Sequence, residues 1–182
     1  MKGAAEVKSS KYLKILKDRY SRLFDIYENY KVGDNYFDLL TSCNIKGVKY
    51  MLTKKAKVYT VERNEHCLVN LFNNPVNLER LKDVADKVID SIDYLVEPHP
   101  DHMKTIITGV IIAEYGASEE GENFVMTFRY QKPFMFYLKG WCEVRLVLVD
   151  LYQQKLVHNP KDKEVVKLYN IPDDLMNKVD SR

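Results

Sequence analysis

The sequence is poor in cysteine, glycine and proline, and it has no long hydrophobic run. Its 182 residues include 3 Cys, 7 Gly and 6 Pro, and 46% are hydrophobic, which excludes collagenous and intrinsically disordered proteins. The longest apolar stretch, Ile106–Ala113, has eight residues, whereas a membrane-spanning helix needs about 20. The first ten residues contain no apolar segment typical of a secretory signal. We therefore expect a globular chain with no membrane partner.

The few cysteines indicate a reducing compartment. Cys43, Cys67 and Cys142 are widely separated, odd in number and form no Cys-x-x-Cys pair, so they provide no disulfide framework. We expect reduced thiols packed as small hydrophobic side chains, and hence a cytoplasmic location.

The sequence also lacks a charge excess and the common catalytic motifs. Its 28 Lys and Arg against 26 Asp and Glu leave a net charge of +2. General nucleic-acid binders normally carry a strong basic excess, so this charge gives no electrostatic argument for that class of protein. The motifs GxGxxG, GxxxxGK[ST], HExxH and GxSxG do not occur, so the common sequence signatures of nucleotide-binding proteins, zinc proteases and serine hydrolases are absent.

Apolar residues with helical spacing predict two long helices. The first covers residues 10–31, begins near Ser9 or Ser10, either of which can cap it, and ends before Gly33, which is placed to terminate it. The second covers residues 77–96 and is stopped by prolines. Short helices are predicted at residues 118–131 and at the C-terminus.

Alternating apolar and polar residues predict strands between the helices. A turn at Lys46-Gly47 joins the first two strands, a charged turn at residues 62–65 follows, and residues 66–72 fit either a strand or a short helix. One later strand is apolar on both faces, which is typical of the centre of a sheet, and another bends at Gly140. The strands are predicted at residues 37–45, 48–61, 103–115, 134–152 and 156–159.

Together these elements predict an α+β fold. We expect a single-layer, mainly antiparallel sheet of about five or six strands with the two long helices packed on it. Residues 1–8 are predicted to form a flexible tail and residues 9–182 a single domain, because the length is typical of one domain and neither a linker nor an internal repeat interrupts it.

Three short motifs resemble a known family. They span most of residues 9–170 and are Asn64-Glu65-His66-Cys67, Thr108-Gly109-Val110, and Gly140-Trp141 followed by Arg145. The chain resembles a short bacterial domain family of unknown function, found mostly in anaerobic Gram-positive bacteria. That family has no assigned activity, so the resemblance implies no activity, cofactor or site residue.

The segment from Glu97 to His102 is the sharpest candidate for a metal site. It places Glu97, His99, Asp101 and His102 within six residues, in a loop stiffened by two prolines. Carboxylates and imidazoles are usual ligands of zinc and iron, and the spacing resembles the H-x-H-x-D-H run of metallo-β-lactamase-type hydrolases, with Glu97 in place of the first His. A metal-dependent hydrolase with a divalent metal is therefore one alternative function. The other interpretation is a solvated loop whose side chains bond nearby backbone amides.

A second pattern resembles part of the PD…(D/E)xK nucleases. Pro100-Asp101 precedes a predicted strand, Glu114 ends that strand, and Glu143 and Arg145 follow later. Those enzymes need two carboxylates for Mg²⁺ and a lysine near the attacking water. Arg145 stands where the lysine is needed, and arginine does not readily give up a proton.

Lysines gather on the predicted strand between residues 46 and 57. Lysines and aromatic residues on a sheet contact phosphates and stack bases, so nucleic-acid binding is a second alternative, with Lys49, Tyr50, Lys55 and Lys57 as the binding residues. Lysines on edge strands also prevent sheet-to-sheet pairing. The net charge of +2 favours this second interpretation, and we do not expect nucleic acid as the partner.

Tyrosines form a stripe on the first predicted helix, at Tyr12, Tyr20, Tyr27 and Tyr30. Such a stripe suits a half-buried surface, either at the rim between helix and sheet or at a homodimer contact. Since no standard catalytic motif is present, we expect a non-catalytic binding or interaction protein without a cofactor. It would bind a protein or a small molecule through a sheet face or groove.

Overall fold

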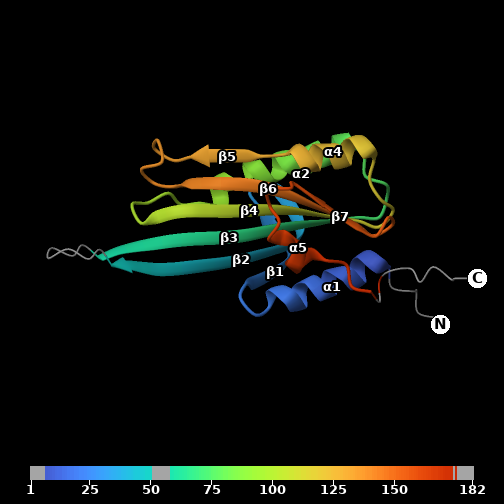
Figure 1. The fold of residues 1–182 in the computed structure, drawn as a ribbon, viewed down its shortest axis with the longest axis horizontal. Helices are drawn as coiled ribbons and strands as arrows, with labels where there is room; N and C mark the ends of the chain where they lie inside the picture. Colours follow the sequence, from blue (N-terminus) through green and yellow to red (C-terminus); the bar gives the residue numbers. More distant parts are fainter. Residues whose placement is uncertain (1–6, 51–57, 174, 176–182) are drawn as a thin grey trace, which may run out of the picture.

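The computed structural model describes residues 7–50, 58–173 and 175, which form one seven-stranded sheet with helices on both faces (Figure 1). The strand order is β1-β2-β3-β4-β6-β5, and β7 pairs with a second stretch of β6. The strands are β1 (Asp25–Val32), β2 (Asn35–Tyr50), β3 (Val58–Phe72), β4 (His102–Ala113), β5 (Tyr130–Pro133), β6 (Trp141–Asp150) and β7 (Lys155–His158). The helices are α1 (Lys8–Tyr20), α2 (Leu78–Asp90), α3 (Ile92–Leu95), α4 (Glu119–Thr127) and α5 (Val165–Tyr169).

The predicted fold class is wrong in the type of sheet, in the number of strands and in the length of the helices. The sheet is mixed, because β4 is parallel to both of its neighbours, β3 and β6, while the other pairs are antiparallel. α2 and α3 connect β3 to β4, and α4 lies on the connection from β4 to β6. A helical crossover carries the chain back to the end of the sheet where the previous strand began, so the next strand runs parallel to it.

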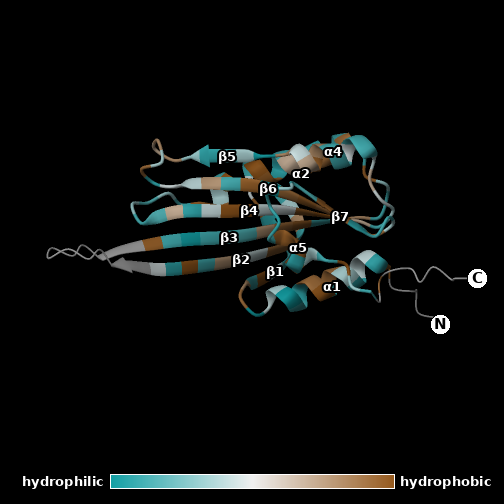
Figure 2. Ribbon diagram, in the orientation of Figure 1, coloured by the Kyte–Doolittle hydropathy of each residue, from teal (hydrophilic) through white to brown (hydrophobic). Residues whose placement is uncertain are grey.

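Two apolar cores lie on the two faces of the sheet. α2 and α4 cover one core, and α1 and α5 cover the other. The central strand β4 supplies both, with Ile107 and Ile111 on the α2 face and Val110 and Ile112 on the α1 face, because successive side chains of a strand point to opposite faces. Hydrophobic residues of β6 and β7 gather at the end of the sheet that the helices cover (Figure 2). The prediction that the strand at residues 103–115 lies at the centre of the sheet is confirmed, because β4 lies between β3 and β6.

The first predicted helix, residues 10–31, is wrong in its second half. α1 ends at Tyr20, and the rest of the predicted helix is mostly β1, which pairs with β2 through a two-residue turn at Gly33-Asp34. Gly33 has a φ of +58°, a value that suits both the end of a helix and a tight hairpin. The glycine therefore signals a chain reversal in either structure, and the sequence pattern did not separate the two.

The predicted turn at Lys46-Gly47 does not form, because β2 continues through both residues. β2 pairs with β3 along a long antiparallel ladder, and residues 51–57 lie outside the described residues. The charged segment 62–65 belongs to β3, and residues 66–72 are strand, not helix. Ion pairs and amide hydrogen bonds join the two strands here in place of apolar packing. This is why a charged stretch of strand resembled a turn.

The second predicted helix, residues 77–96, is divided at Ser91. α2 begins after Asn77, whose side chain accepts a hydrogen bond from the Arg80 amide at 3.0 Å. Ser91 Oγ donates to the carbonyl oxygen of Lys87 at 2.8 Å, a bond that often bends helices. The chain continues as the single turn of α3, so two short helices replace one long one.

The strand predicted at residues 134–152 begins only at Trp141. Residues 134–140 form the loop between β5 and β6, and Gly140 ends this loop with a φ of +72°. A Cβ at Gly140 would collide with the carbonyl oxygens of His102 and Met103. β5 occupies the end of the helix predicted at residues 118–131, which the structure ends at Thr127.

Candidate functional site

The four predicted metal ligands point in different directions. Glu97 and Asp101 are exposed, His99 points towards β3, and the side chain of His102 is buried. Within the described residues, no group of three or more His, Cys, Asp or Glu side chains is placed to hold a metal ion. The four residues therefore do not converge on one point, and the metal hypothesis gains no support from their geometry.

His102 fixes the start of β4 instead. Its Nδ1 lies 2.8 Å from the carbonyl oxygen of Lys139, and its Nε2 lies 2.9 Å from Thr105 Oγ1. Since a carbonyl oxygen only accepts, Nδ1 donates to it, and in the neutral imidazole Nε2 then accepts from the threonine hydroxyl. The buried imidazole thus ties the β5–β6 loop to β4.

His99 meets an acid that the sequence pattern did not identify. Its Nε2 lies 2.5 Å from Glu62 Oε2, and Lys46 Nζ lies 2.8 Å from the other oxygen of the same carboxylate. The Lys46 ammonium is the main cause that holds the pKa of Glu62 below its usual value, against the opposing effect of burial. Glu62 lies in the segment expected to be a turn, so its cross-strand register with Lys46 was not apparent.

His66 is a second buried histidine, on β3. It is 8% exposed, its Nδ1 lies 3.0 Å from Ser42 Oγ, and its buried Nε2 has no hydrogen-bond partner in the described part of the chain. Burial lowers the pKa of His66 to about 4. A serine–histidine pair acts as a nucleophile when a third group orients the imidazole. Here Nε2 meets no such group, and the pair is a contact between neighbouring strands.

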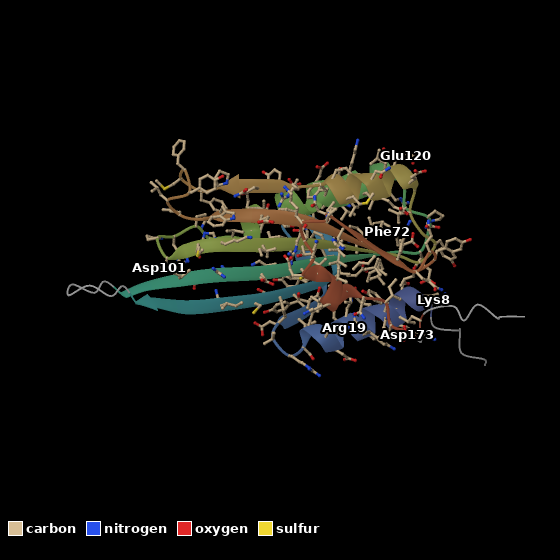
Figure 3. All side chains as sticks on the ribbon, in the orientation of Figure 1. Lys8, Arg19, Phe72, Asp101, Glu120 and Asp173 are labelled. Atoms are coloured by element: carbon tan, nitrogen blue, oxygen red, sulfur yellow. The ribbon has the colours of Figure 1, made fainter. Side chains whose placement is uncertain are left out.

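The predicted nuclease carboxylates lie at opposite ends of β4. Asp101 precedes the strand and lies at the end of the molecule remote from Phe72 and Lys8 (Figure 3). Glu114 follows the strand, and its backbone amide donates to the carbonyl oxygen of Phe72. Since β4 has 12 residues and a strand rises by about 3.3 Å per residue, the two acids are about 40 Å apart. Glu114 accepts hydrogen bonds from the backbone amides of Lys8 and Ser9 at 3.3 and 2.6 Å, so it caps α1.

The remaining residues of that pattern form separate ion pairs. Glu143 pairs with Lys104 at 2.8 Å. Arg145 donates to Thr108 Oγ1 at 2.9 Å and pairs with Glu164 at 2.7 Å. The geometry therefore contradicts a shared Mg²⁺ site.

The predicted basic strand is described only in part. Lys49 and Tyr50 lie at the end of β2, where their backbones pair with Tyr59 and Val58. Lys55 and Lys57 lie outside the described residues. The nucleic-acid alternative stays a prediction.

The tyrosine stripe is split between two elements. Tyr12 and Tyr20 on α1 are fully buried, and their hydroxyls donate to the carbonyl oxygen and the hydroxyl of Tyr169, each at 2.6 Å. Tyr27 and Tyr30 lie on the edge strand β1 with ring centroids 5.3 Å apart. The four tyrosines therefore do not form one surface, and the expected half-burial of Tyr12 and Tyr20 is wrong because α5 covers them.

A groove of about 800 Å³ follows β7, and we call it the β7 groove. α4 borders it on one side and α5, with the chain that leads to it, on the other. Its surface is mainly apolar and is formed by Met126, Leu156, Val157, Pro160 and Val166. Met126 and Val166 are among the exposed hydrophobic side chains, so the groove keeps apolar surface in contact with solvent.

Basic side chains surround this apolar surface. Lys155, His158, Lys163 and Lys167 line the β7 groove, and Glu122 is its one acid. Glu122 pairs with Lys155 at 2.6 Å. No acidic side chain in the described residues forms an ion pair with Lys163 or Lys167, which are both exposed. The border of the groove therefore has a positive charge available to a ligand.

β7 also offers unpaired backbone. It pairs antiparallel with β6 from Lys155 with Asp150 to His158 with Val147, and no other described strand pairs with it. In an antiparallel ladder, alternate residues direct their N–H and C=O groups to the outer side. The β7 groove therefore combines apolar surface, lysines and a free strand edge.

Comparison with known proteins gives a family but no function. No helix in the described parts of the chain is long and apolar enough to cross a membrane. The search of curated proteins and the search of solved structures find no match. A family model described as "Domain of unknown function (DUF8052)" matches residues 8–171, which confirms the expected family of unknown function, while the bacterial distribution stays a prediction. The chain belongs to the DUF8052 family.

Proposed function

We propose that this chain is a non-catalytic binding protein that holds a short, extended, acidic segment of a partner protein in the β7 groove. The segment adds a strand to the free edge of β7 and places its apolar side chains on the surface between α4 and α5. Its acidic side chains face Lys163 and Lys167.

The free edge of β7 carries this proposal. β7 is paired on one side only and lies along an apolar groove. In strand addition, main-chain hydrogen bonds supply affinity, and pockets beside the edge select alternate side chains. An isolated exposed edge is an aggregation hazard that proteins usually block with charge or cover with a loop. Here the lysines stand around the groove while apolar side chains at its surface stay exposed.

The charge around the groove selects the chemistry of the segment. Lys163 and Lys167 form no ion pair with an acidic side chain of the described residues, whereas Lys155 forms an ion pair with Glu122. An acidic segment gains attraction from both lysines, and a basic segment is repelled by them. A segment with acidic and apolar side chains in alternation fits both features, because successive strand residues point to opposite sides.

The test is selection from a random-peptide library on the purified chain, followed by fluorescence anisotropy of the selected peptides. We expect sequences that alternate acidic and apolar residues. The double variant Lys163→Glu, Lys167→Glu should bind them at least about tenfold more weakly, because two attractive contacts become repulsive.

The matched control is the double variant Lys11→Glu, Lys82→Glu. It changes net charge equally at two exposed helical lysines outside the groove, and it should bind like the parent chain. Failure to select any peptide, or equal binding by both double variants, contradicts the proposal.

A further inference from the structure

The loop between β5 and β6 exposes four successive apolar or aromatic side chains, which we call the apolar tip. Met135 is 60% exposed, Phe136 95%, Tyr137 55% and Leu138 77%. Exposed single hydrophobic residues are ordinary on protein surfaces, whereas a contiguous group marks an interaction site. The tip lies at the end of β5 and β6 remote from β7 (Figure 1), so it is separate from the β7 groove.

The backbone of the loop holds these side chains outward in an unusual conformation. Met135, Phe136 and Tyr137 have φ values of 45°, 51° and 69°, a left-handed turn that is unfavourable for residues with a Cβ. Three backbone hydrogen bonds close the loop. The amide of Leu138 donates to the carbonyl oxygen of Met135 at 3.0 Å, that of Lys139 to Phe134 at 3.2 Å, and that of Phe134 to Gly140 at 3.0 Å. Strained backbone of this kind is concentrated at functional sites.

The apolar tip includes the amphipathic Tyr137, and a tryptophan and two lysines lie behind it. The ring of Tyr137 contacts the ring of Trp141 with centroids 6.1 Å apart. Lys132 and Lys139 stand at the base of the loop, and Lys132 pairs with Asp93 at 2.5 Å. The loop thus presents apolar side chains first, then tyrosine and tryptophan, then lysine. Proteins at a bilayer place these residue types in the same order, from the hydrocarbon interior to the headgroups.

The size of the tip distinguishes a lipid surface from a protein partner. A standard protein interface takes about 800 Å² from each partner, and four side chains on one narrow loop supply only part of that area. A bilayer needs no matching surface, because apolar side chains simply enter its interfacial region.

We propose that the apolar tip inserts into the interfacial region of an anionic lipid bilayer and attaches the protein peripherally. Phe136 and Leu138 enter most deeply, Tyr137 and Trp141 lie at the headgroup level, and Lys139 contacts lipid phosphates. This departs from the expectation that the chain has no membrane partner.

The test is flotation of the full chain with vesicles of phosphatidylcholine alone and of phosphatidylcholine with phosphatidylglycerol. We expect binding to the anionic vesicles, weaker binding to the neutral ones, and at least a tenfold loss in the double variant Phe136→Ser, Leu138→Ser. Because Trp141 is the only tryptophan and contacts Tyr137, its fluorescence should shift to the blue on binding.

The control is Leu23→Ser, which removes a side chain that is also 77% exposed, on the turn after α1. This variant should bind vesicles like the parent chain, and equal thermal unfolding of all variants shows that the fold is retained. Absence of vesicle binding, or equal binding by the tip variant, overturns the proposal. Equal binding to neutral and anionic vesicles overturns the role of the lysines. Self-association that is lost in the tip variant without vesicle binding assigns the tip to a protein contact instead.

Discussion

At the scale of single residues, His66 makes stability depend on pH. Burial lowers its pKa to about 4 in the folded chain, against about 6.5 in an unfolded one. Between these values the unfolded state binds more protons, so acidification favours unfolding. The free energy of unfolding should fall by about 2 kcal/mol between pH 7 and pH 5 through this group alone.

The measurement is urea unfolding of the parent chain and of His66→Gln at pH 7 and pH 5. The parent should lose about 2 kcal/mol more than the variant over this interval. The lowered pKa of Glu62 acts at lower pH, because its stabilisation is complete above the unfolded-state pKa of about 4.3 and is lost as the pH falls towards the lower pKa of the folded state. An equal pH dependence in both proteins contradicts the account of His66.

The candidate residues show what a local pattern leaves open. Glu97, His99, Asp101 and His102 are close in sequence, yet contacts from other elements decide where each side chain points. His99 turns to Glu62 on β3, and His102 turns to Thr105 and to the β5–β6 loop. Their spacing in the sequence predicted that the four side chains lie close together and face one point. Contacts with other elements instead direct them to different partners, so they do not face one point as metal ligands would.

At the scale of elements, Glu114 decides how α1 begins. The local pattern predicted a serine cap, but Ser9 lies inside the helix and its amide donates to Glu114 from the end of β4. A carboxylate at this end satisfies free amides and offsets the positive end of the helix dipole.

Replacing Glu114 by Gln should lower the free energy of unfolding by about 1–2 kcal/mol, since the charged hydrogen bonds weaken. Hydrogen exchange should become faster in α1 while α2 stays unchanged. Glu97→Gln is the control, because Glu97 is exposed and caps no helix. Unchanged exchange in α1 would show that Glu114 is not its cap.

Elements whose hydrophobic pattern fits only one type of secondary structure were predictable from the sequence. Elements whose pattern fits both a helix and a strand were not. The apolar segment Ile106–Ala113 has a single solution as the buried centre of β4. Gly33 suits both a helix end and a hairpin, and the aromatic residues before it satisfy both periods. Charged residues of β3 resembled a turn because their partners lie on β2, which a local pattern does not show.

At the scale of the whole molecule, the parallel pairing of β4 determines where the binding surfaces lie. The close approach of α2 to β4 requires Gly109, where a Cβ would meet Val88 and Leu146. This explains one motif of the family resemblance as packing. The crossovers place β6 next to β4 and leave β7 at an edge. Residues of α4 then meet the continuous segment of β7 and α5 to form the β7 groove, so no single sequence motif predicts it.

Hydrogen exchange of β7 with a selected peptide bound tests the central claim most directly. If the segment adds a strand to β7, amides that face outward in Lys155–His158 should become protected at saturation, while those of another edge strand, β1, should keep their rates. Unchanged exchange in β7 with the peptide bound, or new protection at β1 instead, would contradict strand addition in the β7 groove.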